Sequence, residues 1–421
     1  MSEHQPFISK IDINDEIINT NFDVVGSKYS NLPMLSLGFH SFINQVREKM
    51  NDKQLKERLF YLVVNHFEHK IIDYPDDLES FSNKFFNNKS ENNFERSFFK
   101  LWELIIYFDL IPINDNNFLS ANLCESDGSF SRAIIEYRLK FGKASDIKKD
   151  KYCIITKPNN SNVNNLISEC LVKWKSSIFK YDKSDISLND ESSNDGGLDN
   201  VSNIKNYIKL VSKEKKYAKL ITCNGDYNTS NEVDIYKLIL GQILTAINIQ
   251  EKGGNMILKI FDTYTLPTLK LICLLNSMYN EIYICKPLMS RSFKEEKFVV
   301  CKGFKFSQDT KLKNISDKLF DLLDKMNKEE NIYDIFSEYK TNEIFLKKIT
   351  EINLKLTNEQ YVMINNIIEY KNSGNFFGDA YHKYKDNQID STKWWINNFF
   401  VKDIKELKSS QTKFKNIESI A

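Results

Sequence analysis

The sequence has no closely spaced pair of cysteines. Its seven cysteines stand singly along 421 residues, at positions 124, 153, 170, 223, 273, 285 and 301. Zinc sites and disulfide frameworks use cysteines at short recurring spacings, so we expect neither, and a reducing compartment fits this usage better. His66 and His69 lie one helical turn apart but have no third ligand nearby, so we interpret them as ordinary helix residues rather than a metal site.

The sequence also lacks membrane and export signals. No uninterrupted apolar run is long enough to span a bilayer, and residues 1–21 contain no continuous apolar core of the kind found in signal peptides. The sequence also has no large excess of positive or negative charge, because it contains 58 basic and 57 acidic side chains, a formal net charge of +1. A nucleic acid would therefore have to be bound through a local basic patch.

The length of the chain exceeds what one compact core usually holds. We divide it into an N-terminal helical extension (1–93), a central α/β domain (94–306) and a C-terminal helical region (307–421). Residues 184–203 are rich in Ser, Asn, Asp and Gly and poor in apolar side chains, so we expect a mobile surface loop there. Residues 1–31 show little periodicity.

Short apolar runs alternate with amphipathic patterns in the central domain. The expected strands cover residues 119–123, 152–155, 174–181, 217–223, 256–260, 281–286 and 297–302, and the expected helices cover residues 94–110, 134–139, 232–250 and 265–279. This alternation is typical of an α/β fold. We expect Gly253 and Gly254 to end the third of these helices, and Thr265 with Pro267 to begin the fourth.

Two places in this pattern indicate a site. Lys259 interrupts the apolar run that predicts a buried strand, and a lysine there is costly unless it is paired or functional. The turn CESDGSFS, residues 124–131, joins a strand to a helix. A glycine-bearing turn in this position lets a cofactor approach the backbone and the first amides of the helix.

Three motifs in a fixed order give the chain a resemblance to a known family. They are Lys259 with Phe261 and Asp262, then Lys286-Pro287 with Ser290-Arg291, then the strand from Glu296 to Gly303. In this order they resemble the C-terminal half of the FtsJ-like, Rossmann-type RNA 2'-O-methyltransferases, above all the mRNA cap ribose methyltransferases of eukaryotes and large DNA viruses. The resemblance implies a Rossmann-like methyltransferase sheet flanked by helices, with helical additions at both ends.

The resemblance also implies a set of catalytic residues. In the family a ribose hydroxyl attacks the methyl group of S-adenosylmethionine while a neutral lysine takes the hydroxyl proton. Lys259 matches that lysine, Lys100 matches a second cation on a preceding helix, and Glu296 matches the acid that orients Lys100. Asn224 stands where the family has an aspartate that fixes the base. Taken by itself, Lys100 would be a solvated helix residue.

Several positions implied for cofactor binding depart from the family pattern. The implied positions are Asn122, Cys124, Glu125, Ser126, Asp127, Gly128, Phe130, Thr156, Asn200 and Asn224. Asn122, Asn200 and Asn224 replace acids, and the turn at residues 125–127 directs two carboxylates toward the carboxylate of S-adenosylmethionine. Two like charges about 4 Å apart repel by about 4 kcal/mol at an effective dielectric constant near 20, so these departures disfavour binding.

Two functions are compatible with these residues. The first is an S-adenosylmethionine-dependent RNA ribose 2'-O-methyltransferase of the mRNA cap region, with activity impaired by the departures on the cofactor side. The second is a catalytically inactive protein that keeps the methyltransferase fold and serves as an RNA-binding or structural component of a virion or complex. Either implies a cytoplasmic location, in the host cytoplasm or the virion if the protein is viral.

RNA, and capped mRNA in particular, is the implied partner. A basic surface near Lys100 is expected to face it, formed by Lys286, Arg291, Lys294 and Lys297. The alternative is a solvated run of charges on a loop. Trp394 and Trp395 could stack on bases, although core packing is the commoner use of such residues. The helical flanks could bind a protein partner, and no contact with a membrane is expected.

Overall fold

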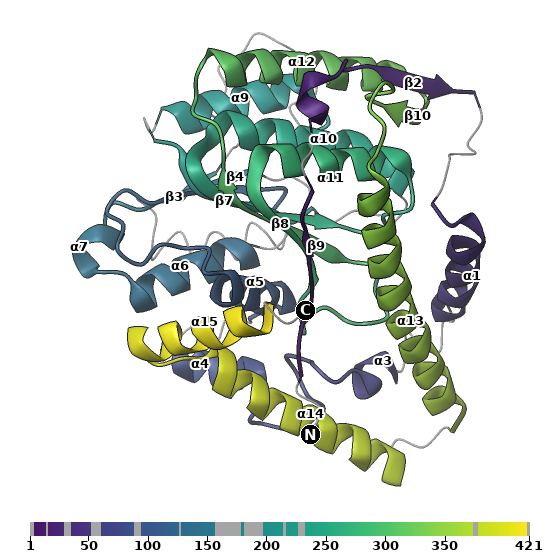
Figure 1. The fold of residues 1–421 in the computed structure, drawn as a ribbon. Coiled ribbons are helices and arrows are strands. Elements are labelled where there is room, and N and C mark those ends of the chain that lie inside the picture. The colour runs from purple at the N-terminus through teal and green to yellow at the C-terminus, as the bar shows by residue number, and fades with distance from the viewer. Residues whose placement is uncertain are drawn as a thin grey trace.

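The computed structural model describes residues 4–13, 16–28, 35–51, 60–87, 94–125, 128–155, 178–180, 197–213, 216–225, 232–373 and 378–418. In this part of the chain eight strands form one sheet with helices on both faces (Figure 1). In spatial order they are β1 (Phe7–Ile11), β8 (Tyr279–Lys286), β9 (Lys297–Phe304), β7 (Gln250–Ile260), β6 (Ala218–Cys223), β3 (Leu119–Leu123), β4 (Lys151–Ile155) and β5 (Ile178–Lys180). The predicted α/β fold with a Rossmann-like sheet is confirmed.

The direction of the strands changes at β7. The strands from β5 to β7 are parallel, whereas β9 is antiparallel to both β7 and β8. In the pairing of β7 with β9, Lys259 lies opposite Phe298 and Ile260 lies opposite Lys297. The end of β7 is therefore beside the start of β9, which brings Lys259 close to the residue that precedes Lys297.

Helices cover the two faces of the sheet as separate groups (Figure 1). One face carries α9 (Val201–Ser212), α10 (Glu232–Ile249), α11 (Leu266–Met278) and α12 (Thr310–Lys328), and the other carries α5 (Arg96–Phe108), α6 (Ser129–Phe141), α14 (Asp379–Phe399) and α15 (Ile404–Glu418). Because the sheet is covered from both sides, its central strands are buried and apolar. Thr265 is the N-cap of α11 and Pro267 lies in its first turn, which confirms the predicted start.

A third apolar cluster joins the N-terminal part of the chain to the C-terminal helices. It contains side chains of α1 (Leu37–Glu48), α3 (Phe60–Val64) and α13 (Glu343–Ser373). The smaller elements are η1 (Ile17–Asn19), η2 (Lys49–Asn51), α4 (Leu78–Phe85), α7 (Ala144–Ile147) and a sheet of β2 (Val24–Ser27) with β10 (Asn331–Ile335). Among the helices in the described ranges, none has both the length and the apolarity needed to cross a bilayer.

Two expectations about the flanking regions are wrong. The first 31 residues, where periodicity is weak, contribute the strands β1 and β2, and β10 lies in a C-terminal region that was expected to be helical. The helix expected around His66 is also shorter, because α3 ends at Val64. Both errors have the same cause, since short strands and helix ends are decided by distant pairing rather than by local periodicity.

Two helix boundaries also differ from the prediction. Gly253 and Gly254 lie inside β7, and α10 ends before them at Ile249. Gly253 has a φ of +84°, a conformation that glycine adopts without a steric penalty, so it lets the strand bend rather than ending the helix. The next helix, α11, ends at Met278, and Tyr279 therefore begins β8 instead of completing the helical face.

The loop predicted at residues 184–203 is wrong at its C-terminal end. Residues 184–196 lie outside the described residues. Leu198 is fully buried, and Asn200 caps α9 by accepting a hydrogen bond of 2.8 Å from the amide of Ser202. The chain is therefore anchored from Leu198 onward, because α9 packs on the sheet through an apolar face that the polar composition of the preceding residues does not reveal.

Candidate active site

The structure brings Lys100, Lys259 and Glu296 together at the rim of the sheet. Lys100 comes from α5, Lys259 from the end of β7, and Glu296 immediately precedes β9. Oε1 of Glu296 forms an ion pair with Nζ of Lys100, and Oε2 of Glu296 lies 3.9 Å from Nζ of Lys259. One carboxylate thus bridges two amines that are far apart in the sequence.

Burial and opposing charges decide the protonation of this cluster. Burial alone would raise the pKa of Glu296, but the ammonium groups of Lys100 and Lys259 lower it well below its ordinary value, so the carboxylate stays ionised. Burial lowers the pKa of Lys100, Glu296 opposes that shift, and Lys259 adds to it. The site therefore contains a fixed negative charge and an amine that gives up its proton more readily than a solvated lysine.

Hydrogen bonds from the side chains of Ser290 and Lys286 hold Glu296 in place. The hydroxyl of Ser290 donates a hydrogen bond of 2.9 Å to Oε1 of Glu296. Nζ of Lys286 donates to the carbonyl oxygens of Lys294, at 2.6 Å, and Glu296, at 2.9 Å. Lys286 thereby closes the connection between β8 and β9, which we call the 287–296 loop. The amine of Lys286 stabilises this loop, and burial lowers the pKa of Lys286 to about 7.

Two buried acids that the sequence prediction missed hold the same loop. Glu103 accepts hydrogen bonds from the amides of Leu288, at 2.7 Å, and Met289, at 2.9 Å. Glu68 accepts two hydrogen bonds from Arg291, at 2.8 and 3.1 Å, and also pairs with Arg96. Glu103 lies one turn after Lys100 on α5, so the helical spacing from Lys100 could have identified it. No sequence signal points to Glu68.

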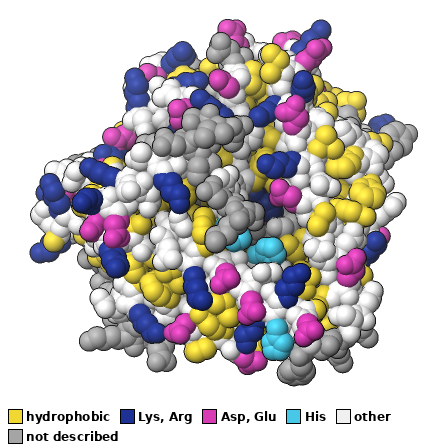
Figure 2. All heavy atoms as spheres, turned by 60° about the horizontal axis from the view of Figure 1, so that its bottom comes forward, with side chains coloured by type: hydrophobic (Ala, Val, Ile, Leu, Met, Phe, Trp, Pro, Cys, Tyr) yellow, Lys and Arg dark blue, Asp and Glu magenta, His cyan; other side chains and the backbone are white. Residues whose placement is uncertain are grey.

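The prediction that these four basic residues form an exposed surface for RNA is largely wrong. Lys286 and Lys297 are buried, with exposed fractions of 8% and 4%, because their amines are used inside the loop and at the rim of the sheet. Arg291 is paired with Glu68, and Lys294 is the one of these four residues that is exposed. On the face shown in Figure 2, basic side chains are interspersed with acidic ones.

Glu125 is turned toward the first amides of α6. Its carboxylate is buried and accepts hydrogen bonds from the amides of Phe130, at 3.4 Å, and Ser131, at 3.2 Å, and from the hydroxyl of Ser131, at 3.1 Å. A carboxylate at the N-terminus of a helix is stabilised by the amides and the helix dipole. The amides that would otherwise be available to the anionic end of a cofactor are thus occupied by the protein.

The other positions implied for the cofactor have different surroundings. Asn122 is fully buried, donates to Ser131 at 2.9 Å and accepts from Thr222 at 2.9 Å, so it joins β3, β6 and α6. The side chain of Phe130 is packed in the core against Phe298. Asn200 caps α9.

Two described residues, on either side of positions 126 and 127, have positive φ angles. Gly128 has a φ of +78° and Cys124 a φ of +54°, and the amide of Asn224 donates to the carbonyl of Leu123 at 3.1 Å, so β3 and β6 end side by side. Ser126, Asp127 and Thr156 lie outside the described residues.

The charge of Glu125 allows a test of whether this turn fits S-adenosylmethionine. That molecule carries an ammonium and a sulfonium group against one carboxylate, so its net charge is positive. A buried carboxylate attracts those two cationic groups, although it leaves no amide of Phe130 or Ser131 for the carboxylate of the cofactor. The charge of the buried Glu125 carboxylate therefore fits the cationic part of S-adenosylmethionine, which it would attract.

Trp394 and Trp395 differ in their surroundings. Trp395 is fully buried and its indole NH donates to Glu103 at 2.7 Å, so core packing is confirmed and base stacking is wrong for this residue. Trp394 is partly buried and lies edge-on to His4 and Phe67.

Comparison with known proteins gives matches in the same part of the chain. A family model described as FtsJ-like methyltransferase matches residues 94–304. The chain is 29% identical over 191 residues to the inactive cap-specific mRNA (nucleoside-2'-O-)-methyltransferase 1B of Caenorhabditis briggsae, covering 42% of this chain and 22% of that protein. It is 37% identical over 116 residues to a probable methyltransferase of African swine fever virus, covering 26% of this chain and 27% of that protein.

Two further matches are shorter or more distant. The cap-specific mRNA (nucleoside-2'-O-)-methyltransferase 1 of Trypanosoma cruzi is 30% identical over 115 residues, covering 26% of this chain and 31% of that protein. The solved structure of an O-methyltransferase family protein from Burkholderia thailandensis aligns with 63% of this chain and 73% of its own, at a TM-score of 0.32 and 9% identity. The chain spans less than a third of the length of these three sequence relatives.

Proposed function

Because this chain belongs to the FtsJ-like methyltransferase family, we propose that it transfers a methyl group from S-adenosylmethionine to a ribose 2'-hydroxyl of RNA. The observation that carries the proposal is the convergence of Lys100, Lys259 and Glu296 at the rim of the sheet. We propose the cap region of mRNA as the target, since relatives from Caenorhabditis briggsae and Trypanosoma cruzi are named as cap-specific. Residues 94–306 would form the catalytic domain, and the reaction would take place in the cytoplasm.

The three side chains have separate tasks in this reaction. Lys259 accepts the proton of the ribose hydroxyl, Lys100 hydrogen-bonds that hydroxyl, and Glu296 holds Lys100 and balances the charge of the amines. S-adenosylmethionine, when bound, supplies the electrophilic methyl group. As the hydroxyl loses its proton to the amine of Lys259, the positive charge that the cofactor loses reappears on that amine, and the ionised Glu296 is placed to stabilise it.

Asn224 gives the site a different charge from the family pattern. It follows β6 and is buried, with an exposed fraction of 3%. An asparagine can accept a hydrogen bond but adds no negative charge, so Glu296 is the acid assigned to the amines in this proposal. Of the four basic residues assigned to RNA, Lys294 is exposed and would be available to it.

The proposal is tested by cofactor binding and methyl transfer measured on the same preparation. Calorimetry with S-adenosylmethionine should show binding, and capped RNA should acquire a methyl group at a ribose 2'-oxygen. Lys259→Met should lower the rate by about 10²–10⁴-fold, the usual contribution of a general base, while the heat of cofactor binding is retained. Lys302→Met, at the far end of β9, is the matched control and should leave the rate unchanged. An active Lys259→Met protein would contradict the assignment.

A second function is favoured by one observation on the cofactor side. Glu125 occupies the amides of Phe130 and Ser131, and three asparagines stand where the family has acids. A protein with these features could keep the fold as an RNA-binding or structural component without methyl transfer, and one relative is named inactive. RNA binding by a folded protein that gives no heat with S-adenosylmethionine would favour this function over the first.

A further inference from the structure

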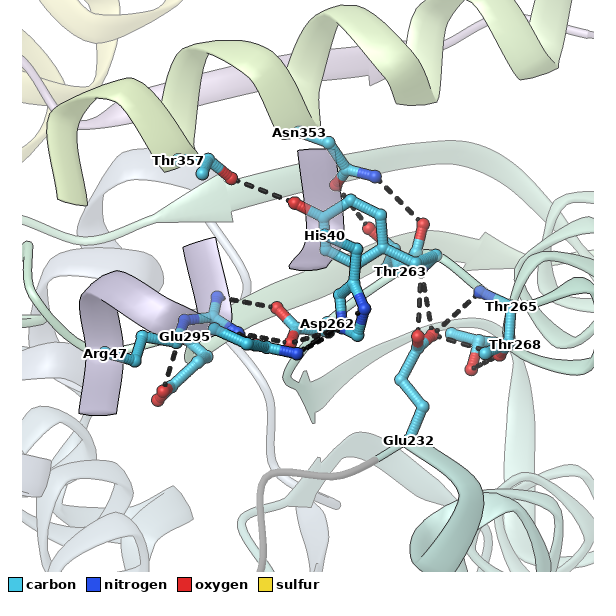
Figure 3. A network of polar contacts seen from close by, with 12 residues as sticks. His40, Arg47, Glu232, Asp262, Thr263, Thr265, Thr268, Glu295, Asn353 and Thr357 are labelled. Carbon is cyan, nitrogen blue, oxygen red and sulfur yellow. Dashed lines mark hydrogen bonds and ion pairs between the residues drawn. The ribbon is translucent and has the colours of Figure 1, made fainter. Parts of the chain in front are cut away.

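Arg47 connects the two strand ends that carry the site. It lies in the last turn of α1, and its guanidinium group donates to both carboxylate oxygens of Asp262, at 2.6 and 2.9 Å (Figure 3). Its Nε atom lies 3.5 Å from Oε1 of Glu295. Asp262 follows β7 three residues after Lys259, and Glu295 is the neighbour of Glu296. One guanidinium group thus joins the carboxylate of Asp262, near the proposed base, to the carboxylate of Glu295, next to the acid.

The position of Arg47 is itself fixed by α13. Oε1 of Gln360 accepts hydrogen bonds from Nε of Arg47 at 3.1 Å and from Nη2 at 2.9 Å. The amide of Gln360 donates to the carbonyl of Phe293 at 2.7 Å, within the 287–296 loop. Because a guanidinium group has five donors in a rigid plane, these partners determine its orientation as well as its position.

Two further helices hold the segment that follows β7. Asn353 and Thr357 lie one turn apart on α13. Asn353 forms two hydrogen bonds with Thr263, of 2.7 and 2.9 Å, and the hydroxyl of Thr357 lies 3.0 Å from the hydroxyl of Tyr264 (Figure 3). From α10, Glu232 accepts hydrogen bonds from the amides of residues 264 and 265. The segment therefore has contacts with α1, α10 and α13. Arg47, on α1, contacts both this segment and the 287–296 loop.

The charges at Asp262 explain why Arg47 is needed there. Asp262 is buried, and burial alone would raise its pKa, but Arg47 lowers it below the ordinary value, with smaller contributions from Lys297 and His40. A buried carboxylate that loses its bidentate partner is strongly destabilised. Removing Arg47 would therefore displace Asp262 and the end of β7 rather than leave them in place.

We propose that Arg47 is a positioning residue of the active site, which sets the separation of Lys259 and Glu296 by holding Asp262 and Glu295 together. The proposal rests on the methyltransferase function proposed above. It assigns a role to α1 and α13, since they hold this guanidinium group, and to Asp262, the last residue of the first sequence motif. Arg47 acts through its neighbours and has no contact with the substrate in this assignment.

The test compares kinetic constants of four variants of the full chain. Arg47→Met and Asp262→Asn should each lower kcat by about 10–100-fold, because displacement of a reacting group by about 1 Å has effects of this size, while KM for RNA and Kd for S-adenosylmethionine stay within about twofold. Arg47→Lys should fall between Arg47→Met and wild type, since it keeps the charge without the bidentate geometry. Lys49→Met, which removes an exposed charge next to α1, is the matched control and should leave kcat unchanged.

Two results would overturn the proposal. One is a raised KM with an unchanged kcat in Arg47→Met, and the other is a kcat of Arg47→Met and Asp262→Asn equal to that of Lys49→Met. If the wild-type protein transfers no methyl group, the proposed function fails, but hydrogen exchange still tests the positioning. Peptides covering residues 259–265 and 293–299 should then exchange faster in Arg47→Met and Asp262→Asn than in Lys49→Met. Equal exchange in all of them would contradict the role of Arg47 even so.

Discussion

The indole Nε1 atom of Trp395 donates a hydrogen bond of 2.7 Å to Oε1 of Glu103, and this contact joins α14 to the helix that carries Lys100. The same carboxylate accepts the amides of Leu288 and Met289. A residue near the C-terminus and a loop next to the acid of the site are therefore attached to one side chain. The C-terminal helices thereby support the 287–296 loop through a buried hydrogen-bond network.

Replacing Glu103 with Gln should destabilise the protein by about 1–3 kcal/mol, the cost of leaving a buried polar group unsatisfied. All three partners of Glu103 are donors, and a glutamine offers one acceptor oxygen, so at least one donor would face its NH2 group. Urea unfolding followed by circular dichroism measures the change. The exposed Glu351→Gln is the control, and equal midpoints for the two variants would show that the network contributes nothing.

Glu232 should give the stability a measurable pH dependence. Burial raises its pKa to about 7 in the folded protein, from 4.5. Between these values the folded state binds more protons than the unfolded state, so the contribution of Glu232 to stability decreases as the pH rises from about 4.5 to 7. The difference in unfolding free energy between wild type and Glu232→Gln should fall by up to about 3 kcal/mol over that range. A difference that stays constant with pH would exclude the raised pKa.

Gly241→Ala should destabilise the contact between α10 and the segment before α9. A Cβ atom at position 241 would lie 1.6 Å from the backbone carbonyl oxygen of Leu198, so one of the two segments would have to move. We expect a loss of about 1–3 kcal/mol, typical of overpacking, and a lower melting temperature. Gly38→Ala in α1 meets nothing within 4 Å and should stabilise the protein by about 0.5–1 kcal/mol. Similar shifts for both would show that the close approach has no effect.

Arg138→Met should be the most destabilising of these changes. Arg138 and Asp150 are fully buried, form two hydrogen bonds of 2.8 and 2.9 Å, and connect α6 to β4. Removing one partner of a buried ion pair leaves the other charge without compensation and typically costs about 3–5 kcal/mol. The double variant Arg138→Met with Asp150→Asn should lose less than the sum of the two single losses. Strict additivity in calorimetric unfolding would show that the pair is not coupled.

The family resemblance carried by the motifs was sufficient to predict that Lys100, Lys259 and Glu296 lie together. Lys259 lies at the end of β7 and Glu296 immediately precedes the neighbouring β9, whose antiparallel pairing sets both strand ends, so their closeness follows from the fold once the fold is assigned. Arg47 could not be predicted in the same way. Its partner Asp262 is remote in sequence, and a charged residue in the last turn of an amphipathic helix has the same appearance whether it is solvated or buried.

The expected basic surface failed for a related reason. A sequence shows that Lys286 and Lys297 are basic, but it does not show which groups compete for their amines. In the structure Lys286 satisfies two backbone carbonyls of the 287–296 loop, an arrangement that compensates the burial of its charge. Charge patterns in loops next to strand ends therefore predict sites of stabilisation as readily as sites of RNA binding.

The pairing of β1 with β8 affects how the sheet is completed when the protein folds during translation. Residues 7–11 leave the ribosome before their partners, residues 282–286, which follow 271 to 279 positions later in the chain. At roughly 5–20 residues per second, the first strand waits on the order of tens of seconds for its neighbour. During that interval the nascent chain carries an unpaired strand. Completion of the sheet depends on a contact between two segments that are more than 270 positions apart in the sequence.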